Sequence, residues 1–225
     1  MEDPWHPDRI LHRGAEAVVE SGRWFGSPAV RKVRVPKPYR HPALDATLGR
    51  ARLISELRIL QRARLEGLPV PGLLDADLSR STIVMEHLEG IPLRDHLESK
   101  GGTDALLEAV GALIRRLHRM GVVHGDLSTS NLLVDADERV SLLDFGLAST
   151  EFDVERYGID LHVLDEVLEA THPEVEGAID HVVDGYLALE RRLGAPPPHA
   201  GGAIPGAEEV IQRLVQIRTR VRYHG

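Results

Sequence analysis

Three polar side chains between Val122 and Gly146 have the types and spacing needed for phosphoryl transfer. Asp126 and Asn131 lie close together in the sequence, and Asp144 opens an Asp-Phe-Gly triplet after two apolar segments. Phosphoryl transfer needs metal-bridged phosphates and an acceptor that is oriented in line with them. Asp126 would orient or deprotonate the acceptor, and Asn131 and Asp144 would each hold a Mg²⁺ ion.

Both motifs also have purely structural interpretations. His124-Gly-Asp is compatible with a turn between a strand and a helix, and Asp-Phe-Gly is compatible with a β-turn that ends in glycine. Their joint presence, with apolar strands expected at Leu132–Val134 and Val140–Leu143, favours the catalytic interpretation. In that interpretation His124 is a scaffold residue rather than a base.

Two further residues upstream would bind and position phosphates. Lys32 lies in an alternating strand, where it would reach the α- and β-phosphates of a nucleotide. A helix predicted from Leu44 to Leu65 carries Glu56 as the candidate partner of Lys32. Two alternatives remain open: Glu56 as an ordinary solvated helix charge, and the basic residues around Lys32 as the charges of a solvated edge strand.

The remaining nucleotide contacts are expected in a hairpin loop and in a hinge. The loop Gly14, Ala15, Glu16 and Ala17 would cover the phosphates, although its single glycine fits a plain hairpin equally well. The segment Met85 to Gly90 has the character of a connection between two lobes. Backbone groups at Glu86 and Leu88 would hold the adenine there.

Composition restricts the possible classes of protein. The chain has 225 residues, 42% of them hydrophobic, no cysteine and a formal net charge of -8. The absence of cysteine excludes a disulfide framework and a cysteine-ligated zinc site. No apolar run approaches the roughly 20 residues of a membrane span, and the first residues lack a signal-peptide pattern, so we expect a cytoplasmic protein. The acidic balance argues against a surface that binds nucleic acid over its whole extent.

The predicted fold class is α+β, a minimal bilobal protein-kinase-like fold. A small antiparallel sheet with one helix is expected over residues 1–90, ending in the hinge, and a helical lobe with the catalytic and metal-binding loops over 91–193. A Pro/Gly linker at 194–206 and a final helix with a basic tail at 207–225 complete the chain. At this length, peripheral helices of a full two-lobed kinase must be missing. The predicted helices are Leu93–Ser99, Ala105–Met120, Ile159–Ala170, Val175–Arg192 and Ala207–Ile217.

Several longer motifs together resemble one atypical kinase family, the kinase subunit of the KEOPS/EKC complex (the p53-related protein kinase family). They are GAEA at 14–17, VRKVRVPKPYRHPALD at 30–45, HGDLSTSN at 124–131, DFGLAS from Asp144, and IDLHVLDEVLEATHP at 159–173. This family assists formation of threonylcarbamoyladenosine (t6A) in tRNA. The resemblance implies ATP and Mg²⁺ as cofactors, a threonylcarbamoyltransferase (Kae-type) subunit and other KEOPS subunits as partners, and Ser/Thr kinase or ATPase activity.

The resemblance also implies a role for each matching residue. Lys32 would be the phosphate-binding lysine, Glu56 its helix partner, Asp126 the catalytic base, and Asn131 and Asp144 the metal ligands. The chain departs from the family in its altered Arg-rich tail and in a longer Pro/Gly linker.

The catalytic loop and the segment after it predict an unusual mode of regulation. Gly125 stands where many kinases carry an arginine that receives an activation-loop phosphate, and Ser128 stands where they carry a lysine. No Ala-Pro-Glu anchor follows the Asp-Phe-Gly triplet. We therefore expect ATP hydrolysis or autophosphorylation rather than processive phosphorylation of proteins.

Basic clusters suggest a contact with tRNA. They comprise Arg34, Lys37 and Arg40 in the first lobe, and Arg213, Arg218, Arg220 and Arg222 at the end of the chain. The end could instead fold back toward Asp126, or its cations could stabilise a helix C-terminus. Two other functions remain open: a small-molecule phosphotransferase, and a non-catalytic scaffold of the complex.

Overall fold

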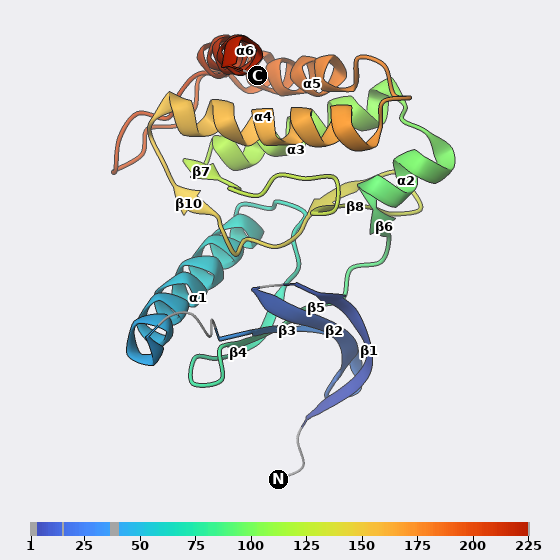
Figure 1. Cartoon of the computed structure of the whole chain (residues 1–225), viewed down its shortest axis with the longest axis vertical. Coiled ribbons are helices and arrows are strands. Elements are labelled where there is room, and N and C mark those ends of the chain that lie inside the picture. The colour runs from blue at the N-terminus through green and yellow to red at the C-terminus, as the bar shows by residue number, and fades with distance from the viewer. Residues whose placement is uncertain (1–3, 15, 37–40, 225) are drawn as a thin grey trace. The chain divides into compact units, whose positions relative to one another are not determined.

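Two compact units, Met1–Glu89 and Gly90–Gly225, make up the chain in the computed structural model. The structure describes residues 4–14, 16–36 and 41–224, without the side chains of residues 42, 43, 46 and 221–224. The first unit is a sheet with one long helix, and the second is mainly helical (Figure 1). The α+β class and the antiparallel sheet of the first lobe are therefore confirmed.

The sheet of the first unit has the order β1-β2-β3-β5-β4, and all its neighbouring strands are antiparallel. Its strands are β1 Trp5–Arg13, β2 Ala17–Trp24, β3 Ser27–Arg34, β4 Leu73–Asp77 and β5 Thr82–Glu86. The first strand begins at Trp5, which is buried against Ala29 and Val84. The central strand β3 carries Lys32 opposite Val19 and Ile83.

Helix α1 (Pro42–Leu65) supplies the other side chain expected at the phosphates. Its buried positions Leu53, Glu56, Leu60 and Ala63 are spaced three or four residues apart, so they share one face of the helix. Glu56 is thus a buried charge among apolar neighbours and not a solvated helix charge.

The second unit contains five helices and five short strands among its described residues. The helices are α2 Leu93–Lys100, α3 Asp104–His118, α4 Val154–Thr171, α5 Ala178–Leu193 and α6 Ala207–His224. The strands are β6 Ile91–Pro92, β7 Val122–Val123, β8 Leu132–Val134, β9 Val140–Leu142 and β10 Ser149–Thr150. They form a sheet of order β6-β8-β9 and a pair β10-β7. The loops that connect these short strands carry Asp126, Asn131 and Asp144.

Helices α3 and α5 are in close backbone contact. A Cβ atom at Gly111 would lie 1.8 Å from the carbonyl oxygen of Val182, and one at Gly185 would lie 1.9 Å from that of Glu108. No side chain fits at either position, so the two glycines set the distance between the helices. This contact fixes α3, the helix that leads into β7 and the catalytic loop.

Three helix boundaries differ from the sequence predictions by three residues or more. Helix α4 begins at Val154 because the side chain of Asp153 accepts a hydrogen bond from the Glu155 amide at 3.0 Å. Helix α5 begins only at Ala178, after Gly177 in a left-handed conformation. Helix α6 continues past Ile217 to His224, so the basic end predicted as a tail is helical.

The Pro/Gly segment before α6 is attached to α3 at both ends. The Arg119 guanidinium donates to the carbonyl oxygens of Gly194 at 2.6 Å and Ala195 at 3.2 Å. Arg115 donates to the carbonyl oxygen of Pro205 at 3.0 Å. In the part of the chain that the structure describes, no helix is both long enough and apolar enough to cross a membrane.

Candidate active site

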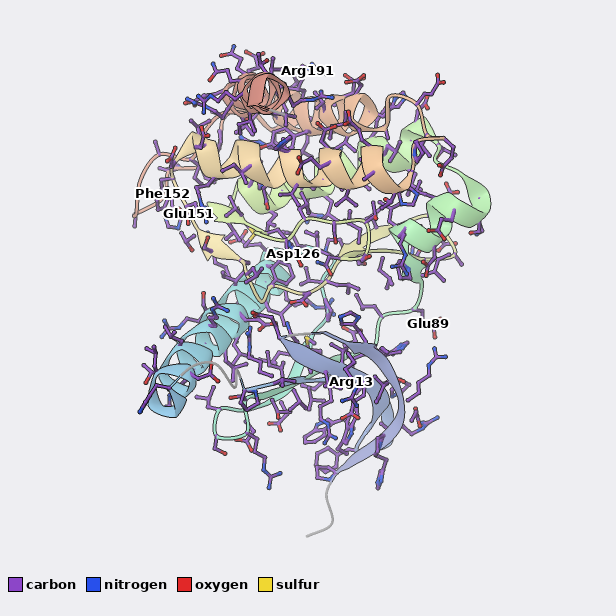
Figure 2. The ribbon with its side chains drawn as sticks, viewed as in Figure 1. Arg13, Glu89, Asp126, Glu151, Phe152 and Arg191 are labelled. Atoms are coloured by element: carbon purple, nitrogen blue, oxygen red, sulfur yellow. The ribbon has the colours of Figure 1, made fainter. Side chains whose placement is uncertain are left out.

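The catalytic loop runs from β7 to β8 and brings Asp126 and Asn131 together. Asn131 Nδ2 donates to the backbone oxygen of Asp126 at 2.8 Å and to its carboxylate Oδ2 at 3.1 Å. Asp126 itself is exposed on this loop (Figure 2), whereas β7 and β8 on either side are buried. A carboxylate that is held in place yet open to solvent can receive a proton from a bound acceptor.

A buried aspartate of α4, Asp160, fixes the backbone of this loop. Its Oδ2 accepts from the His124 amide at 2.7 Å and its Oδ1 accepts from the Gly125 amide at 2.8 Å. Only 2% of Asp160 is exposed. Gly125 has φ +77°, and a Cβ there would lie 2.4 Å from the carbonyl oxygen of Leu147, so glycine is required at this turn. The backbone conformation at position 125 therefore explains why glycine stands here in place of the arginine that many kinases carry.

Asp160 positions the candidate site and was not assigned in the sequence analysis. Its signal was a carboxylate within an otherwise apolar helix face that includes Tyr157, Leu161 and Leu164. A buried carboxylate needs hydrogen-bond donors. The sequence alone did not indicate that those donors are amides of the catalytic loop.

Behind Asp160, a buried chain of hydrogen bonds continues through α3 and α5. Arg115 Nη1 donates to the Tyr186 hydroxyl at 3.0 Å, which is 2.8 Å from His118 Nδ1. His118 Nε2 is 3.1 Å from Asp160 Oδ2. In the neutral ring with the proton on Nε2, each group donates to the next, from Arg115 to Asp160. Arg115 also pairs with Glu190 at 2.8 Å.

Acid is expected to weaken this network. Burial lowers the pKa of His118, so the folded protein keeps the ring neutral while the unfolded chain takes up a proton below about pH 6.5. Stability is then fully present above that pH and falls as the pH drops toward 5, by at most about 1.4 kcal/mol per pH unit for this one proton. Denaturant titrations at pH 7 and pH 5 measure the loss.

The His118→Gln variant should lose less stability than the wild type between these two pH values. The variant His6→Gln, which removes an exposed histidine from β1, is the matched control and should follow the wild type. An equal acid-induced loss in His118→Gln and the wild type would contradict the assignment.

The Asp-Phe-Gly triplet is connected to the catalytic loop through His124. His124 Nε2 donates to the carbonyl oxygen of Leu143 at 2.8 Å, and its ring lies 5.3 Å from that of Phe145. Phe145 is buried, while Asp144 is exposed. Asp144 has φ +52° and accepts a hydrogen bond from the Gly146 amide at 3.0 Å. His124 therefore acts as a scaffold between the two motifs.

The donor atoms at Asn131 and Asp144 fit magnesium. Asn131 uses its amide nitrogen toward Asp126, which leaves its amide oxygen as the metal-binding atom. Asp144 adds an exposed carboxylate, and hard oxygen donors of these two kinds are those that Mg²⁺ prefers. The remaining ligands of such ions are normally phosphate oxygens and water.

In the first unit, Lys32 and Glu56 form a buried ion pair. Lys32 Nζ lies 2.6 Å from Glu56 Oε1, with side-chain exposures of 6% and 3%. Glu56 Oε2 is 2.5 Å from Nη2 of Arg34, a second cation from β3. The ion pair expected from the sequence is thus present, and the sequence analysis had missed Arg34 as its third member. The sequence did contain a signal for Arg34. Side chains alternate between the two faces of a strand, and Lys32 and Arg34 are two residues apart, so they lie on the same face of β3.

The hairpin loop and the hinge, which were predicted to contact the nucleotide, hold their residues in different local contacts. Gly14 donates through its amide to the carbonyl oxygen of Ala17 at 3.0 Å, and Glu16 lies 3.3 Å from Arg52. Ala15, Lys37 and Arg40 lie outside the described residues. Glu86 and Leu88 are partly buried; the Glu86 carboxylate accepts from the Gly72 amide at 3.1 Å. That hydrogen bond fixes the end of β5.

Arginines of α6 are paired with carboxylates of α4. Arg213 and Arg220 lie 3.0 and 3.3 Å from Glu155, and Arg218 lies 2.8 Å from Asp165. The side chain of Arg222 is outside the described residues. Much of the basic charge that suggested a contact with tRNA is therefore engaged within the chain.

Comparison with solved structures gives the class of protein. The Rio2 kinase–ADP/Mg²⁺–phosphoaspartate complex from Chaetomium thermophilum matches 94% of this chain and 62% of that one, with a TM-score of 0.57 and 21% identity. Residues 15–170 match the model of the lipopolysaccharide kinase (Kdo/WaaP) family. The fold is thus kinase-like.

Comparison with curated proteins gives the family within this class. The KEOPS complex subunit Bud32 of Pyrococcus abyssi is 37% identical over 224 residues, covering 96% of each chain. A probable bifunctional tRNA threonylcarbamoyladenosine biosynthesis protein of Methanospirillum hungatei is 37% identical over 218 residues, or 97% of this chain and 37% of the relative. The chain therefore belongs to the Bud32 family of kinase-like proteins. It spans about a third of the length of the bifunctional relatives.

Proposed function

We propose that this protein is an ATP-binding atypical Ser/Thr kinase and ATPase that acts in a KEOPS-type complex supporting t6A modification of tRNA. The observation that carries the proposal is the catalytic loop, in which Asn131 holds Asp126 and Asp160 holds the loop backbone. Such pre-organisation is the main contribution that a protein makes to phosphoryl transfer.

Each residue then has a defined task. Lys32 binds the α- and β-phosphates, and Glu56 orients Lys32 through the 2.6 Å ion pair. Asp126 orients the attacking hydroxyl or water and accepts its proton. Asn131 and Asp144 hold Mg²⁺, which when bound offsets the charge of the transferring phosphoryl group. The loop from Gly14 to Ala17 would cover the phosphates, and backbone groups near Glu86 and Leu88 would receive the adenine.

Names of the relatives support the assignment to a complex. Relatives are named as KEOPS subunits or as proteins of t6A biosynthesis, and in the bifunctional relatives this chain matches only part of the length. We infer a Kae-type threonylcarbamoyltransferase subunit as the principal partner, together with other KEOPS subunits, and a cytoplasmic location. Contact with tRNA through Arg34 and the end of α6 has weaker support, because these cations already pair with carboxylates.

Replacing Asp144 with alanine tests the metal site. Because Asp144 supplies the only carboxylate in the proposed ligand pair, we expect Asp144→Ala to weaken ATP binding in Mg²⁺ by about tenfold or more. Calorimetric titration of ATP with Mg²⁺ and with EDTA measures this. The control Asp137→Ala removes an exposed carboxylate from the turn between β8 and β9 and should leave the Mg²⁺ dependence intact. An identical Mg²⁺ dependence in Asp144→Ala and wild type would contradict the metal assignment.

Adding the Kae-type partner tests the assignment to a complex. The segment between Asp144 and α4 is short and contains no Ala-Pro-Glu anchor, so we expect the partner to complete the site and raise the ATPase rate several-fold. Sizing chromatography and phosphate release measure binding and rate. If saturating partner forms no complex and leaves the rate unchanged, the small-molecule phosphotransferase alternative replaces this part of the proposal.

A further inference from the structure

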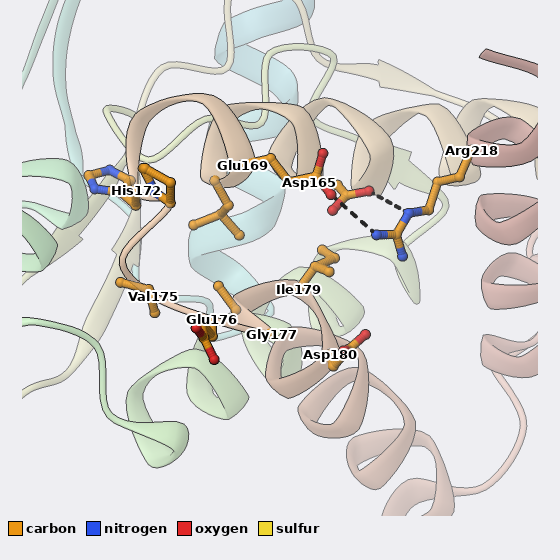
Figure 3. Close-up of a pocket in the computed structure, with 12 residues that line it drawn as sticks. Asp165, Glu169, His172, Val175, Glu176, Gly177, Ile179, Asp180 and Arg218 are labelled. Atoms are coloured by element: carbon orange, nitrogen blue, oxygen red, sulfur yellow. Dashed lines mark ion pairs between the residues drawn. The ribbon is translucent and has the colours of Figure 1, made fainter. Parts of the chain in front are cut away.

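A hollow in the helical unit includes none of the residues assigned to ATP. It is a pocket of about 380 Å³ between the end of α4, the segment 172–177 and the start of α5, with Arg218 of α6 at one side (Figure 3). Pockets of this size are at the lower end of those that hold small molecules.

The charged side chains in its walls are predominantly acidic. Carboxylates come from Asp165 and Glu169 on α4, from Glu176 in the connecting segment and from Asp180 on α5. Arg218 is the one arginine or lysine among the lining residues that the structure describes, and Figure 3 shows its guanidinium directed at the two carboxylates of α4. It lies 2.8 Å from Asp165 and 3.5 Å from Glu169. A single cation leaves an excess of negative charge in the pocket.

Two buried polar groups in this wall lack hydrogen-bond partners among the described residues. Asp165 is 2% exposed, and its Oδ1 has no partner although its Oδ2 binds Arg218. His172 is 1% exposed, and neither ring nitrogen is hydrogen-bonded; its Nδ1 lies 3.6 Å from the Glu174 carboxylate. Burial raises the pKa of Asp165. Buried carboxylate oxygens normally accept hydrogen bonds, so Asp165 Oδ1 can accept one from a further donor. A cationic donor would also offset the negative charge of the carboxylate.

The arrangement of charges favours an extended cation over a small metal ion. The carboxylates are distributed over two helices and a loop, and the apolar side chains of Leu168, Val175 and Ile179 lie among them. A hydrated metal ion gains nothing from apolar walls. A chain of methylene groups with ammonium groups at intervals can bury its stem on such a surface and present its charges to carboxylates.

We propose that this pocket binds a linear aliphatic polyamine. One ammonium group donates to the Asp165 carboxylate, a second pairs with Asp180 and Glu176, and the methylene chain lies against Leu168 and Ile179. Arg218 is a competing internal cation whose side chain is 28% exposed, so it can move outward as the ammonium group approaches Asp165. The site is independent of the proposed ATP chemistry.

Calorimetric titration of the full chain with spermidine, at near-physiological salt, tests this proposal. Saturable binding at one site is expected. Asp180→Asn should weaken it by about tenfold, because an ammonium–carboxylate hydrogen bond is lost. Arg218→Gln should strengthen it, because the competing cation is removed. Asp137→Asn, which removes one exposed carboxylate at the turn between β8 and β9, should leave it unchanged.

The opposite signs of the Asp180 and Arg218 variants separate a built site from general attraction to an acidic protein. If Asp180→Asn fails to fold, Glu176→Gln in the exposed connecting segment provides the same test. Equal weakening by Asp137→Asn and the pocket variants, complete displacement of spermidine by millimolar-range Mg²⁺ alone, or no saturable binding would each overturn the proposal.

Discussion

Replacing Glu56 with alanine is expected to destabilise the first unit far more than replacing Lys32 with methionine. Glu56 has one oxygen on Lys32 and the other on Arg34, and both cations are largely buried. Glu56→Ala therefore leaves two buried cations without their carboxylate, whereas Lys32→Met leaves Glu56 paired with Arg34. Removing one partner of a buried pair typically costs about 3–5 kcal/mol. Denaturant titration measures the difference.

ATP affinity should show a different pattern in these variants. Lys32→Met removes the phosphate-binding cation, so it should lose ATP affinity while it retains most of its stability. The control is Asp8→Ala, which removes an exposed carboxylate from β1 and should change the free energy of unfolding by less than about 1 kcal/mol. Equal destabilisation by Glu56→Ala and Lys32→Met would contradict the shared role of Glu56.

Replacing Asp126 with asparagine is expected to reduce turnover by orders of magnitude and to spare ATP binding. Asparagine keeps the size of the side chain and can still accept the hydrogen bond from Asn131, but it cannot take up the acceptor proton. General-base catalysis contributes about 10²–10⁴-fold to rate, so hydrolysis should fall by that factor. Steady-state phosphate release and calorimetric ATP affinity measure the two quantities.

The loss should appear in kcat and not in ATP affinity, because the interaction is made only in the transition state. The matched control is Asp137→Asn, the same chemical change on an exposed turn of the same unit. Loss of ATP affinity in Asp126→Asn would mean that Asp126 binds the nucleotide and does not act as a base.

The parts of this molecule that could be predicted from sequence are those that depend on residues close together in the chain. The alternation of β3 and the periodicity of α1 indicated a strand that carries Lys32 and a helix that carries Glu56. The turns around Asp126 and Asp144 followed from their motifs. The roles of these four residues and of Asn131, and those of Gly14, Ala15, Glu16, Ala17, Glu86 and Leu88, remain predictions.

Features that depend on contacts between distant elements could not be predicted in the same way. Asp160 binds amides more than 30 residues away, and only the packing of α4 beside β7 brings them together. The pairing of Arg218 with Asp165 likewise requires α6 to lie along α4. The start of α4, in contrast, could have been predicted, because Asp153 is a recognisable N-cap in the sequence. The prediction from the apolar pattern alone placed the start too late, at Ile159.

Single-turnover hydrolysis of γ-labelled ATP, with protein in excess over nucleotide, tests the proposed chemistry most directly. Phosphate release by the wild type should require Mg²⁺ and should be lost in Asp126→Asn, while both proteins bind ATP with similar affinity. Release at the same rate from Asp126→Asn, or release that is indifferent to Mg²⁺, would contradict an active site built from Asp126, Asn131 and Asp144.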